Sequence, residues 1–338
     1  MKRLLSAGEE CCLDKAILLK SLQYDFPLVS RPYATLAQQL GESEGAVVEL
    51  TRELLEKQVV RSIRGFFDAA RLNHRSALVA AHVPEGQLSQ VASRVSAHPG
   101  VSHNYAREHH YNLWFTITTP DSMDLYETAA RLLPDVADVL VLPALRQFKI
   151  DARFTLGHEG VEASLDESIS PPQQGRFEPD RVDKLAIYAL SQPLPVAEQA
   201  FAELAGRVGL TEEVLLKRAR FYLQCGIMRR FGATLNHRRV GFVANGMTVW
   251  IVPSHRVEAV GQLFAGVSAV SHCYERRTYP NWPYNLFTMI HGQTREEVAQ
   301  TVQGMAAMAE IDEWAILYST VEFKKAAVSY FDPTWPES

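Results

Sequence analysis

The sequence predicts an α+β fold in which one module is duplicated in tandem within a single chain. Two observations predict it: short motifs recur in the same order in both halves, and each half repeats one order of apolar-periodic helices and alternating strands. Each module is predicted to be a winged helix-turn-helix followed by a ferredoxin-like βαββαβ sandwich. With 338 residues, 47% of them hydrophobic, the chain can build two such modules.

The duplication rests on five pairs of motifs. They are Asp-Lys at 14–15 and 183–184, LNHR at 72–75 and 235–238, VSHNYAR at 101–107 with VSHCYER at 270–276, YNLWFT at 111–116 with YNLFT at 284–288, and Phe-Lys at 148–149 and 323–324. Five matches in the same order at a nearly constant interval are hard to obtain by chance, so the two halves are copies of one module.

The helix-turn-helix of the first copy follows from apolar periodicity and helix caps. Helices are expected over 15–22, 33–40 and 44–57. Gly41 is placed to end the second helix, and Ser43 to cap the third. The run VVRSIRGFF then predicts the strand of a wing.

The sandwich follows in each copy as strand, helix, two strands, helix and strand. In the first copy these elements are expected at 77–83, 85–98, 101–108, 112–119, 122–133 and 138–150. In the second they are expected at 240–252, 256–266, 270–277, 284–290, 294–309 and 314–324. We expect the two sandwiches to pack sheet to sheet within the chain as a pseudo-dimer, and further self-association is left open.

The predicted boundaries divide the chain into five parts. They are helix-turn-helix 1 (1–60), ferredoxin-like domain 1 (61–156), a linker rich in Ser, Gly, Pro, Glu and Gln (157–180), helix-turn-helix 2 (181–228) and ferredoxin-like domain 2 (229–338).

Composition indicates where in the cell the protein is expected and which kinds of partner it is expected to bind. A net charge of −5 counts against nucleic acid as the main partner. No apolar stretch approaches the roughly 20 residues that a membrane span needs, and the N-terminal segment does not read as a signal peptide. We therefore expect a cytoplasmic protein that does not engage membranes. The four cysteines form no C-x-x-C pair, so neither a disulfide framework nor a structural zinc site is predicted.

A DNA-binding regulator is the alternative that a helix-turn-helix suggests. The predicted recognition helix at 44–57 carries four glutamates against Arg52 and Lys57, which phosphates would repel. The second copy, with Lys217, Arg218 and Arg220, is more plausible. Two recognition helices of unlike composition do not suit a palindromic operator, so DNA is disfavoured as a partner.

The order of domains resembles the Lrp/AsnC family of bacterial regulators, and two longer motifs point to a narrower group. HNYAREHHYNLWFT (103–116) and FGATLNHRRVGFVANGMTVW (231–250) are similar to the siroheme decarboxylases, which share the Lrp/AsnC-like fold. Some members are separate paired subunits and others are fused chains, and this layout looks like the fused form.

The resemblance implies a carbon-carbon lyase. It would remove carbon dioxide, without oxygen, from two acetate side chains of siroheme, giving 12,18-didecarboxysiroheme in haem d1 or alternative haem biosynthesis. No cofactor is implied beyond the substrate, an iron tetrapyrrole, and no protein metal site. A non-catalytic tetrapyrrole carrier or sensor would use the same pocket and stays open.

Siroheme carries eight carboxylates on a flat, largely apolar ring, so its site needs cations, apolar walls and a proton donor. The first copy supplies all three around one hairpin. Strand alternation puts His103, Tyr105 and Arg107 on one face. The expected catalytic residues are His103, His109, His110 and Tyr111. The expected substrate-binding residues of this copy are Tyr105, Arg107 as a carboxylate clamp, Asn112, and Trp114, although a strand tryptophan is more often core.

The second copy differs at the hairpin, where RTYPNWPYN (277–285) replaces REHHYN (107–112) and no histidine pair remains. We therefore expect one fully equipped site in one half, completed by the other. The expected substrate-binding residues here are Arg229, Arg230, His237, Arg238, His272, Tyr274, Arg276 and Tyr284. Arg64, His74 and Arg75 could add positive charge, whereas Lys149 and Lys324 are expected simply to end their strands in water.

Overall fold

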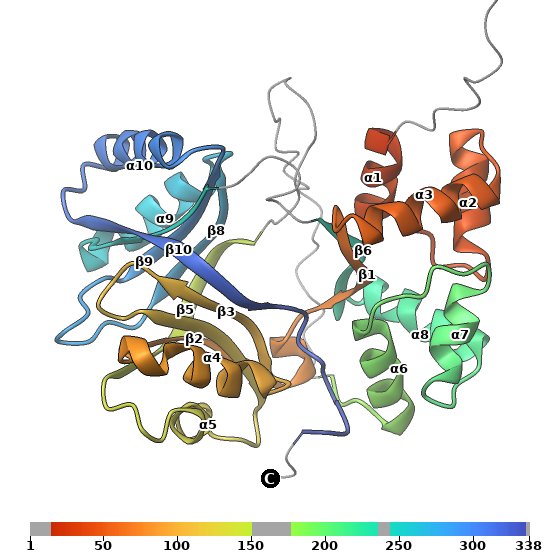
Figure 1. The fold of residues 1–338 in the computed structure, drawn as a ribbon, viewed down its shortest axis with the longest axis horizontal. Helices are drawn as coiled ribbons and strands as arrows, with labels where there is room; N and C mark the ends of the chain where they lie inside the picture. Colours follow the sequence, from red (N-terminus) through yellow and green to blue (C-terminus); the bar gives the residue numbers. More distant parts are fainter. Residues whose placement is uncertain (1–14, 151–176, 236–243, 336–338) are drawn as a thin grey trace, which may run out of the picture.

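The structure is a computed structural model that describes residues 15–150, 177–235 and 244–335. It consists of a helical lobe, built from both helix-turn-helix segments, beside a closed barrel built from both sandwiches (Figure 1). The α+β class and the tandem duplication are thus confirmed. No helix among the described residues is long and apolar enough to cross a bilayer.

The helical lobe contains three helices from each half. They are α1 (Lys15–Tyr24), α2 (Pro32–Leu40), α3 (Glu44–Glu56), α6 (Arg181–Ser191), α7 (Ala200–Gly206) and α8 (Glu212–Gln224). The predicted caps are present: Gly41 ends α2 with φ +70°, and Ser43 Oγ accepts a hydrogen bond from Ala46 N at the start of α3.

The predicted wing strand forms, but its partner differs from that of a wing. Strand β1 (Val60–Phe67) pairs antiparallel with β6 (Met228–Leu235) of the other half, so the two strands make one shared ribbon. Each strand also lies close to the first helix of the opposite half. A Cβ on Gly232 would lie 2.7 Å from the carbonyl oxygen of Leu22, and one on Gly65 would lie 3.2 Å from that of Leu190. The two helix-turn-helix units are therefore interleaved.

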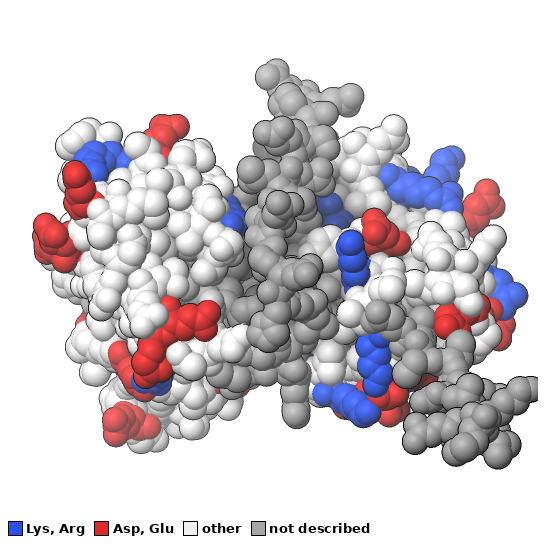
Figure 2. All heavy atoms as spheres, turned by 90° about the horizontal axis from the view of Figure 1, so that it is seen from above, with Lys and Arg blue, Asp and Glu red and all other residues white. Residues whose placement is uncertain are grey.

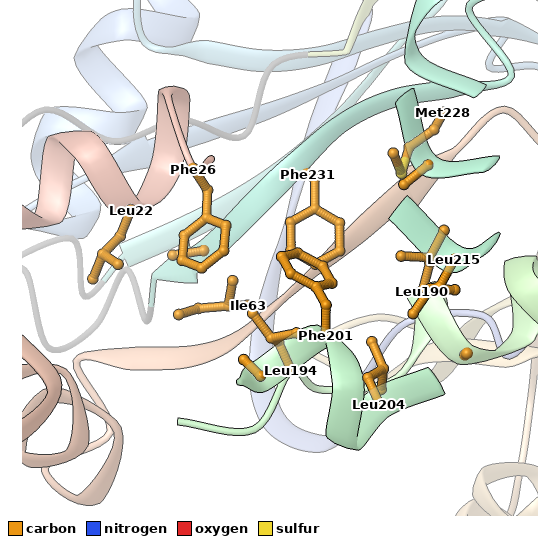
Figure 3. Close-up of a cluster of buried hydrophobic side chains, with 14 of the residues drawn as sticks. Leu22, Phe26, Ile63, Leu190, Leu194, Phe201, Leu204, Leu215, Met228 and Phe231 are labelled. Atoms are coloured by element: carbon orange, nitrogen blue, oxygen red, sulfur yellow. The ribbon is translucent and has the colours of Figure 1, made fainter. Parts of the chain in front are cut away.

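Interleaving gives the helical lobe one hydrophobic core instead of two. Figure 3 shows Phe26 of the first half packed against Phe201 and Phe231 of the second, with ring centroids 6.4 and 5.7 Å away. Ile63 of β1 lies in the same cluster and is fully buried. Neither helix-turn-helix can therefore move as a separate DNA-binding unit without opening this core.

The barrel contains four strands from each half in the order β10-β3-β4-β2-β5-β8-β9-β7. The strands are β2 (His74–Ala81), β3 (Val101–Arg107), β4 (Leu113–Pro120), β5 (Val139–Ile150), β7 (Ala244–Trp250), β8 (Val270–Arg276), β9 (Leu286–Gly292) and β10 (Trp314–Lys325). The helices that cover it are α4 (Leu88–Ala97), α5 (Leu125–Leu132), α9 (Val257–Ala265) and α10 (Arg295–Ala309).

Two long strands close the barrel. Strand β5 pairs with β2 as far as Pro143 and then, from Ala144 onward, with β8 of the second half. Strand β10 leaves β7 at Tyr318 and pairs from Ser319 onward with β3. Proline lacks an amide hydrogen, so Pro143 suits the point where β5 changes partners. The sheets thus join edge to edge as well as packing face to face.

Three hydrophobic clusters fill the barrel and its outer layers. One lies under α4 and α5, a second under α9 and α10, and a third lines the inner faces of both sheets, with Trp114, Met247 and Trp282 among its members. The inner cluster contains residues of both halves. It is the face-to-face contact expected of the pseudo-dimer.

The predicted domain boundaries at 60/61 and 228/229 fall inside β1 and β6, which belong to the helical lobe by their packing. The sequence alone could not place these two domain boundaries, because the β1–β6 ribbon forms between the halves. Most of the predicted linker lies outside the described residues, as does the first part of the strand expected at 240–252.

Candidate functional site

Strands β3 and β8 present the same residue types to the barrel interior. Asn104 donates to the carbonyl of Ala92 in α4, so its neighbours His103 and Tyr105 face inward. In the second half, Cys273 contacts the carbonyl of Gly261 in α9, which turns its own neighbours, His272 and Tyr274, inward. Each histidine is stacked on the tyrosine two residues later, with ring centroids 6.3 Å apart in both halves.

These residues lie where the barrel meets the β1–β6 ribbon. Burial, followed by the positive charges of Lys325, His272, Arg64 and Arg61, lowers the pKa of His103 to about 3. Lys325 pairs with His103 in the β10–β3 register, while Arg61 and Arg64 belong to β1. We name this set the junction cluster: His103, Tyr105, His272, Tyr274, His291, Arg61, Arg64 and Lys325.

The second half contributes a third histidine to the cluster. His291, in β9, accepts or donates through both ring nitrogens: Nδ1 lies 2.5 Å from Asn245 Oδ1 and Nε2 lies 2.7 Å from Ser271 Oγ. Ser271 Oγ in turn lies 2.8 Å from His272 Nδ1. Burial, followed by the charges of His272 and Lys325, lowers the pKa of His291 to about 3. Four side chains therefore form one continuous hydrogen-bonded chain.

Two arginines lie on the same inward face, one in each half. Arg107 donates to the carbonyl of Leu317 at 2.6 Å, and Arg276 donates to that of Leu142 at 2.7 Å. Burial lowers the pKa of each to about 10, so both stay charged at neutral pH. No carboxylate of the described residues forms an ion pair with either, and the Nε of each is buried without a hydrogen-bond partner. They supply positive charge to the barrel interior rather than an exposed clamp.

The ribbon supplies cations on the other side of the junction. Arg64 is largely buried, which lowers its pKa to about 10, while Arg61 forms an ion pair with Glu322 of β10 at 2.9 Å. Arg229 pairs with Asp68 at 2.8 Å, and Arg230 lies 3.7 Å from the centre of the Phe66 ring. Figure 2 shows Lys and Arg side chains on both lobes beside the junction.

The remaining predicted catalytic residues lie at the other end of the barrel. His109, His110 and Tyr111 form the turn after β3, about six residues or roughly 20 Å from His103 along an extended strand. His110 and Tyr111 both donate to Asp138, at 2.9 and 2.8 Å. Burial alone would raise the pKa of Asp138, but these hydrogen bonds outweigh it and hold the pKa below its ordinary value. The structure thus separates residues that the sequence places together.

The predicted binding residues beside that turn are part of the scaffold. The Asn112 amide is held by the backbone of Val83, donating at 2.7 Å and accepting at 2.9 Å. Trp114 is buried in the barrel and donates to the carbonyl of Tyr111. Tyr284 packs against Trp282, with ring centroids 4.8 Å apart.

The other basic residues divide between scaffold and surface. His74 is buried with Nδ1 against the carbonyl of Leu72, and Arg75 pairs with Asp121. The expectation that two lysines end their strands in water was wrong: Lys149 donates to the carbonyl of Val267, and Lys324 to those of Ser96 and His98, just at or beyond the ends of α9 and α4. His237 and Arg238 lie outside the described residues.

A small cavity of about 200 Å³ lies beside the junction cluster, lined in part by Asn245, Arg295 and Tyr318. Ligand pockets for small organic molecules begin at roughly 300 Å³. This cavity is therefore too small for a tetrapyrrole.

The predicted recognition helices are held by the opposite half. Arg52 of α3 donates to the carbonyl of Val196, and Arg220 of α8 donates to that of Leu28. Arg218 is paired with Asp180 and Asp183. The arginine side chains that base contacts would need are thus already engaged by other residues of this protein.

Sequence reasoning missed His291, Ser271 and Asn245, and it missed Arg61 and Lys325. A signal for His291 existed: in YNLFTMIH it follows Phe287 and Met289 at strand spacing, on the inward face. The first copy has Thr118 at the corresponding place, bonded to Ser76, so comparing the two copies gave no hint.

The fold and the inward-facing residues together define a class: a tandem ligand-binding protein of the Lrp/AsnC type. A family model described as the AsnC-like ligand binding domain matches residues 73–149 and 239–324. A second model, described as the siroheme decarboxylase NirDL-like HTH domain, matches residues 14–61.

The relatives identify the family within that class. A siroheme decarboxylase of Hydrogenobacter thermophilus is 38% identical over 93% of this chain and 94% of its own. The siroheme decarboxylase beta subunit of Methanosarcina barkeri is 36% identical over 44% of this chain and 98% of its own length, so one half corresponds to one subunit. A crystal structure of the siroheme decarboxylase NirDL with an iron-uroporphyrin III analogue matches with a TM-score of 0.71 and 33% identity, over 94% of each chain. The chain belongs to the siroheme decarboxylase family, in the form that joins two subunit-like halves.

Proposed function

We propose that this protein is a carboxy-lyase that removes carbon dioxide from two acetate side chains of siroheme, without oxygen, giving 12,18-didecarboxysiroheme. The reaction would serve haem d1 or alternative haem biosynthesis and would need no cofactor beyond the iron of the substrate itself. The observation that carries the proposal is the junction cluster, which joins three histidines to Arg61, Arg64 and Lys325 in this family's fold. The named relative that was crystallised with an iron-uroporphyrin III analogue supports a tetrapyrrole as ligand.

The cations of the junction cluster suit a ligand with many carboxylates. Guanidinium groups bind carboxylates through paired hydrogen bonds, and a partly dry site strengthens the attraction. Tyr105 and Tyr274 offer aromatic faces on the same inward side as the histidines. These groups would hold the tetrapyrrole by its rim while one acetate reaches a histidine.

The chemistry also requires a proton. When an acetate group loses carbon dioxide, the electrons of the broken bond stay on the methylene carbon, which must then bind a proton to become a methyl group. Histidine is suited to supply it near neutral pH. His103 and His291 are neutral at pH 7, because their pKa values are about 3. A substrate with many carboxylates favours the protonated form of nearby imidazoles and so would help to charge its own donor.

The test is an anaerobic incubation of the purified protein with siroheme, followed by mass spectrometry of the extracted tetrapyrrole. We expect the mass of one and then two carbon dioxide molecules to be lost. Binding without any change of mass would instead favour a carrier or sensor. If siroheme does not bind and duplex DNA binds tightly with a strong salt dependence, the regulator interpretation replaces this one.

A further inference from the structure

One carboxylate of the protein itself, that of Glu322 in β10, is paired with a cation of the junction cluster. We propose that Glu322 is a placeholder for a substrate carboxylate: it neutralises Arg61 in the absence of ligand, and a carboxylate of the tetrapyrrole displaces it on binding. Glu322 thereby limits the affinity of the site. This inference rests on the proposed function and deepens it, because it names a residue that sets how tightly the substrate is held.

Glu322 reaches the junction through its position in the barrel. It pairs with Tyr105 in the register of β10 and β3, and cross-strand partners point to the same face of a sheet, so Glu322 lies on the inward side. Its Oε1 lies 2.9 Å from a terminal guanidinium nitrogen of Arg61 in β1, and the exposed fractions of the two side chains are only 19% and 20%. Little water therefore screens this ion pair, which joins the barrel to the β1–β6 ribbon.

The ion pair leaves part of the Glu322 carboxylate unsatisfied. Oε1 pairs with Arg61, whereas Oε2 is buried and has no hydrogen-bond partner among the described residues. A single contact is weaker than the two parallel hydrogen bonds that a guanidinium and a carboxylate can form. A buried oxygen without a donor also costs free energy, which is recovered when the side chain turns toward water. A ligand carboxylate that binds Arg61 through both oxygens can therefore displace Glu322.

The first half has an uncharged residue at the corresponding place. Gln147 comes directly before the repeated Phe-Lys motif, as Glu322 does, and its partner in β8 is a tyrosine, as the partner of Glu322 in β3 is. The counterpart of Arg61 in β6 is Arg229, since each comes three residues after a residue with positive φ. Arg229 pairs with Asp68, which lies outside the barrel strands. The barrel thus folds with a neutral amide at this position, so the scaffold does not require a carboxylate there.

A placeholder keeps a cation from lying unpaired where little water reaches it. A buried charge without a counter-charge destabilises the folded state. Glu322 supplies the counter-charge of Arg61 before the ligand binds and can return to it after the ligand leaves. The free energy needed to displace Glu322 is subtracted from that of binding, so the site holds its substrate less tightly than its cations alone would allow. Such a limit on affinity favours release of a ligand with many carboxylates after each turnover.

The first experiment titrates iron-uroporphyrin III into the full-length protein and follows its absorbance at fixed ionic strength. In Glu322→Gln we expect Kd to fall about 3- to 30-fold, between the effects usual for exposed and for buried ion pairs. The matched control is Glu275→Gln, which removes the same charge from a side chain of 22% exposure. Its partner Arg146 also pairs with Glu258 of α9, on the outer side of the barrel. Kd of this control should stay within about twofold of wild type.

A second titration separates displacement from simple repulsion between Glu322 and the ligand. In an Arg61→Gln background, Glu322→Gln should change Kd less than about threefold, because no arginine remains to be released. Thermal unfolding of each variant confirms that it is folded. An unchanged Kd in Glu322→Gln, an equal fall in Glu275→Gln, or a full gain in the Arg61→Gln background would each overturn the inference. If the wild type binds iron-uroporphyrin III but does not convert siroheme, the proposed function fails, and the titrations still decide the role of Glu322.

Discussion

The two halves of the barrel share one backbone plan but differ in the hydrogen bonds of their histidines. In the second half, His272 and His291 lie at the junction with the helical lobe and are joined through Ser271. In the first half His103 lies there without such a chain, and His109 and His110 lie in the turn at the far end. At that end the second half has Trp282 instead, buried against Trp114.

This difference teaches that duplication preserved the scaffold while the polar chemistry diverged. Arg107 and Arg276 each bind a carbonyl of the strand that closes the barrel, and Asn112 and Asn285 each hold the backbone of a valine. Groups that support the fold are thus duplicated. The chain of hydrogen-bonded histidines is not: where the second half has His291, the first has Thr118, bonded to Ser76.

The largest expected effect separates the two junction histidines. Of His103→Gln and His272→Gln, the variant that removes the proton donor should lower kcat for siroheme by about 10²–10⁴-fold, the usual contribution of a general acid. The other variant should lower kcat by less than about tenfold and act mainly on KM. Steady-state kinetics under anaerobic conditions measure both. Losses below tenfold in both variants would place the donor at another residue.

The next effect concerns the far end of the barrel. Trp282 is 1% exposed, so Trp282→Ala should lower the free energy of unfolding by about 3–5 kcal/mol through lost burial and the cavity left behind. Its indole nitrogen has no hydrogen-bond partner among the described residues, so Trp282→Phe should cost much less. Urea denaturation compares the two. Equal losses would mean that the indole nitrogen contributes to stability.

The buried arginines test whether the scaffold is symmetric. Arg107→Met and Arg276→Met each leave one buried carbonyl, of Leu317 or Leu142, without its donor. Each should cost about 1–3 kcal/mol of unfolding free energy. The two values should agree within about 1 kcal/mol if the halves are equivalent as scaffold. A larger gap would show that one arginine has a further role.

Low pH should reduce the free energy of unfolding through one buried histidine in each half. His103 and His291 have pKa values near 3 in the folded protein, against about 6.5 when unfolded. Below about pH 6.5 the unfolded chain therefore binds protons that the folded chain does not. Stability is complete above that pH and falls toward pH 3, by up to about 1.4 kcal/mol per pH unit for each histidine. Urea denaturation at pH 7, 6 and 5 should show a smaller acid slope in His103→Gln and in His291→Gln.

The smallest expected effect is at the histidine pair of the first half. His110 is an exposed partner of Asp138 and lies far from the junction, so His110→Ala should leave kcat within about threefold of wild type. His109→Ala should behave in the same way. A hundredfold loss in either variant would move the active site to the far end of the barrel.

Local features of the fold could be predicted from the sequence, and features that join the halves could not. Ser43 and Gly41 marked the ends of helices, and strand alternation placed His103, Tyr105 and Arg107 on one face. The pairing of β1 with β6 was not predicted, since a strand does not reveal whether it pairs with its own module or with its copy.

The candidate site was predicted in part for a similar reason. The short sequence distance from His103 to His110 suggested one cluster, but an extended strand carries them apart. His291 is distant in sequence from His103, yet both lie within electrostatic reach of His272 and Lys325, through a barrel that forms only when both halves pair.

The change of partners along β5 has a consequence for synthesis on the ribosome. Ile150 pairs with His272, which is translated about 120 residues later. At 5–20 residues per second, the far part of β5 waits roughly 6–25 s as an open edge. Such edges invite pairing with another nascent chain, and charged side chains discourage it. Arg146 and Lys149 lie on this stretch, where they can act as gatekeepers against aggregation until the second half emerges to complete the barrel.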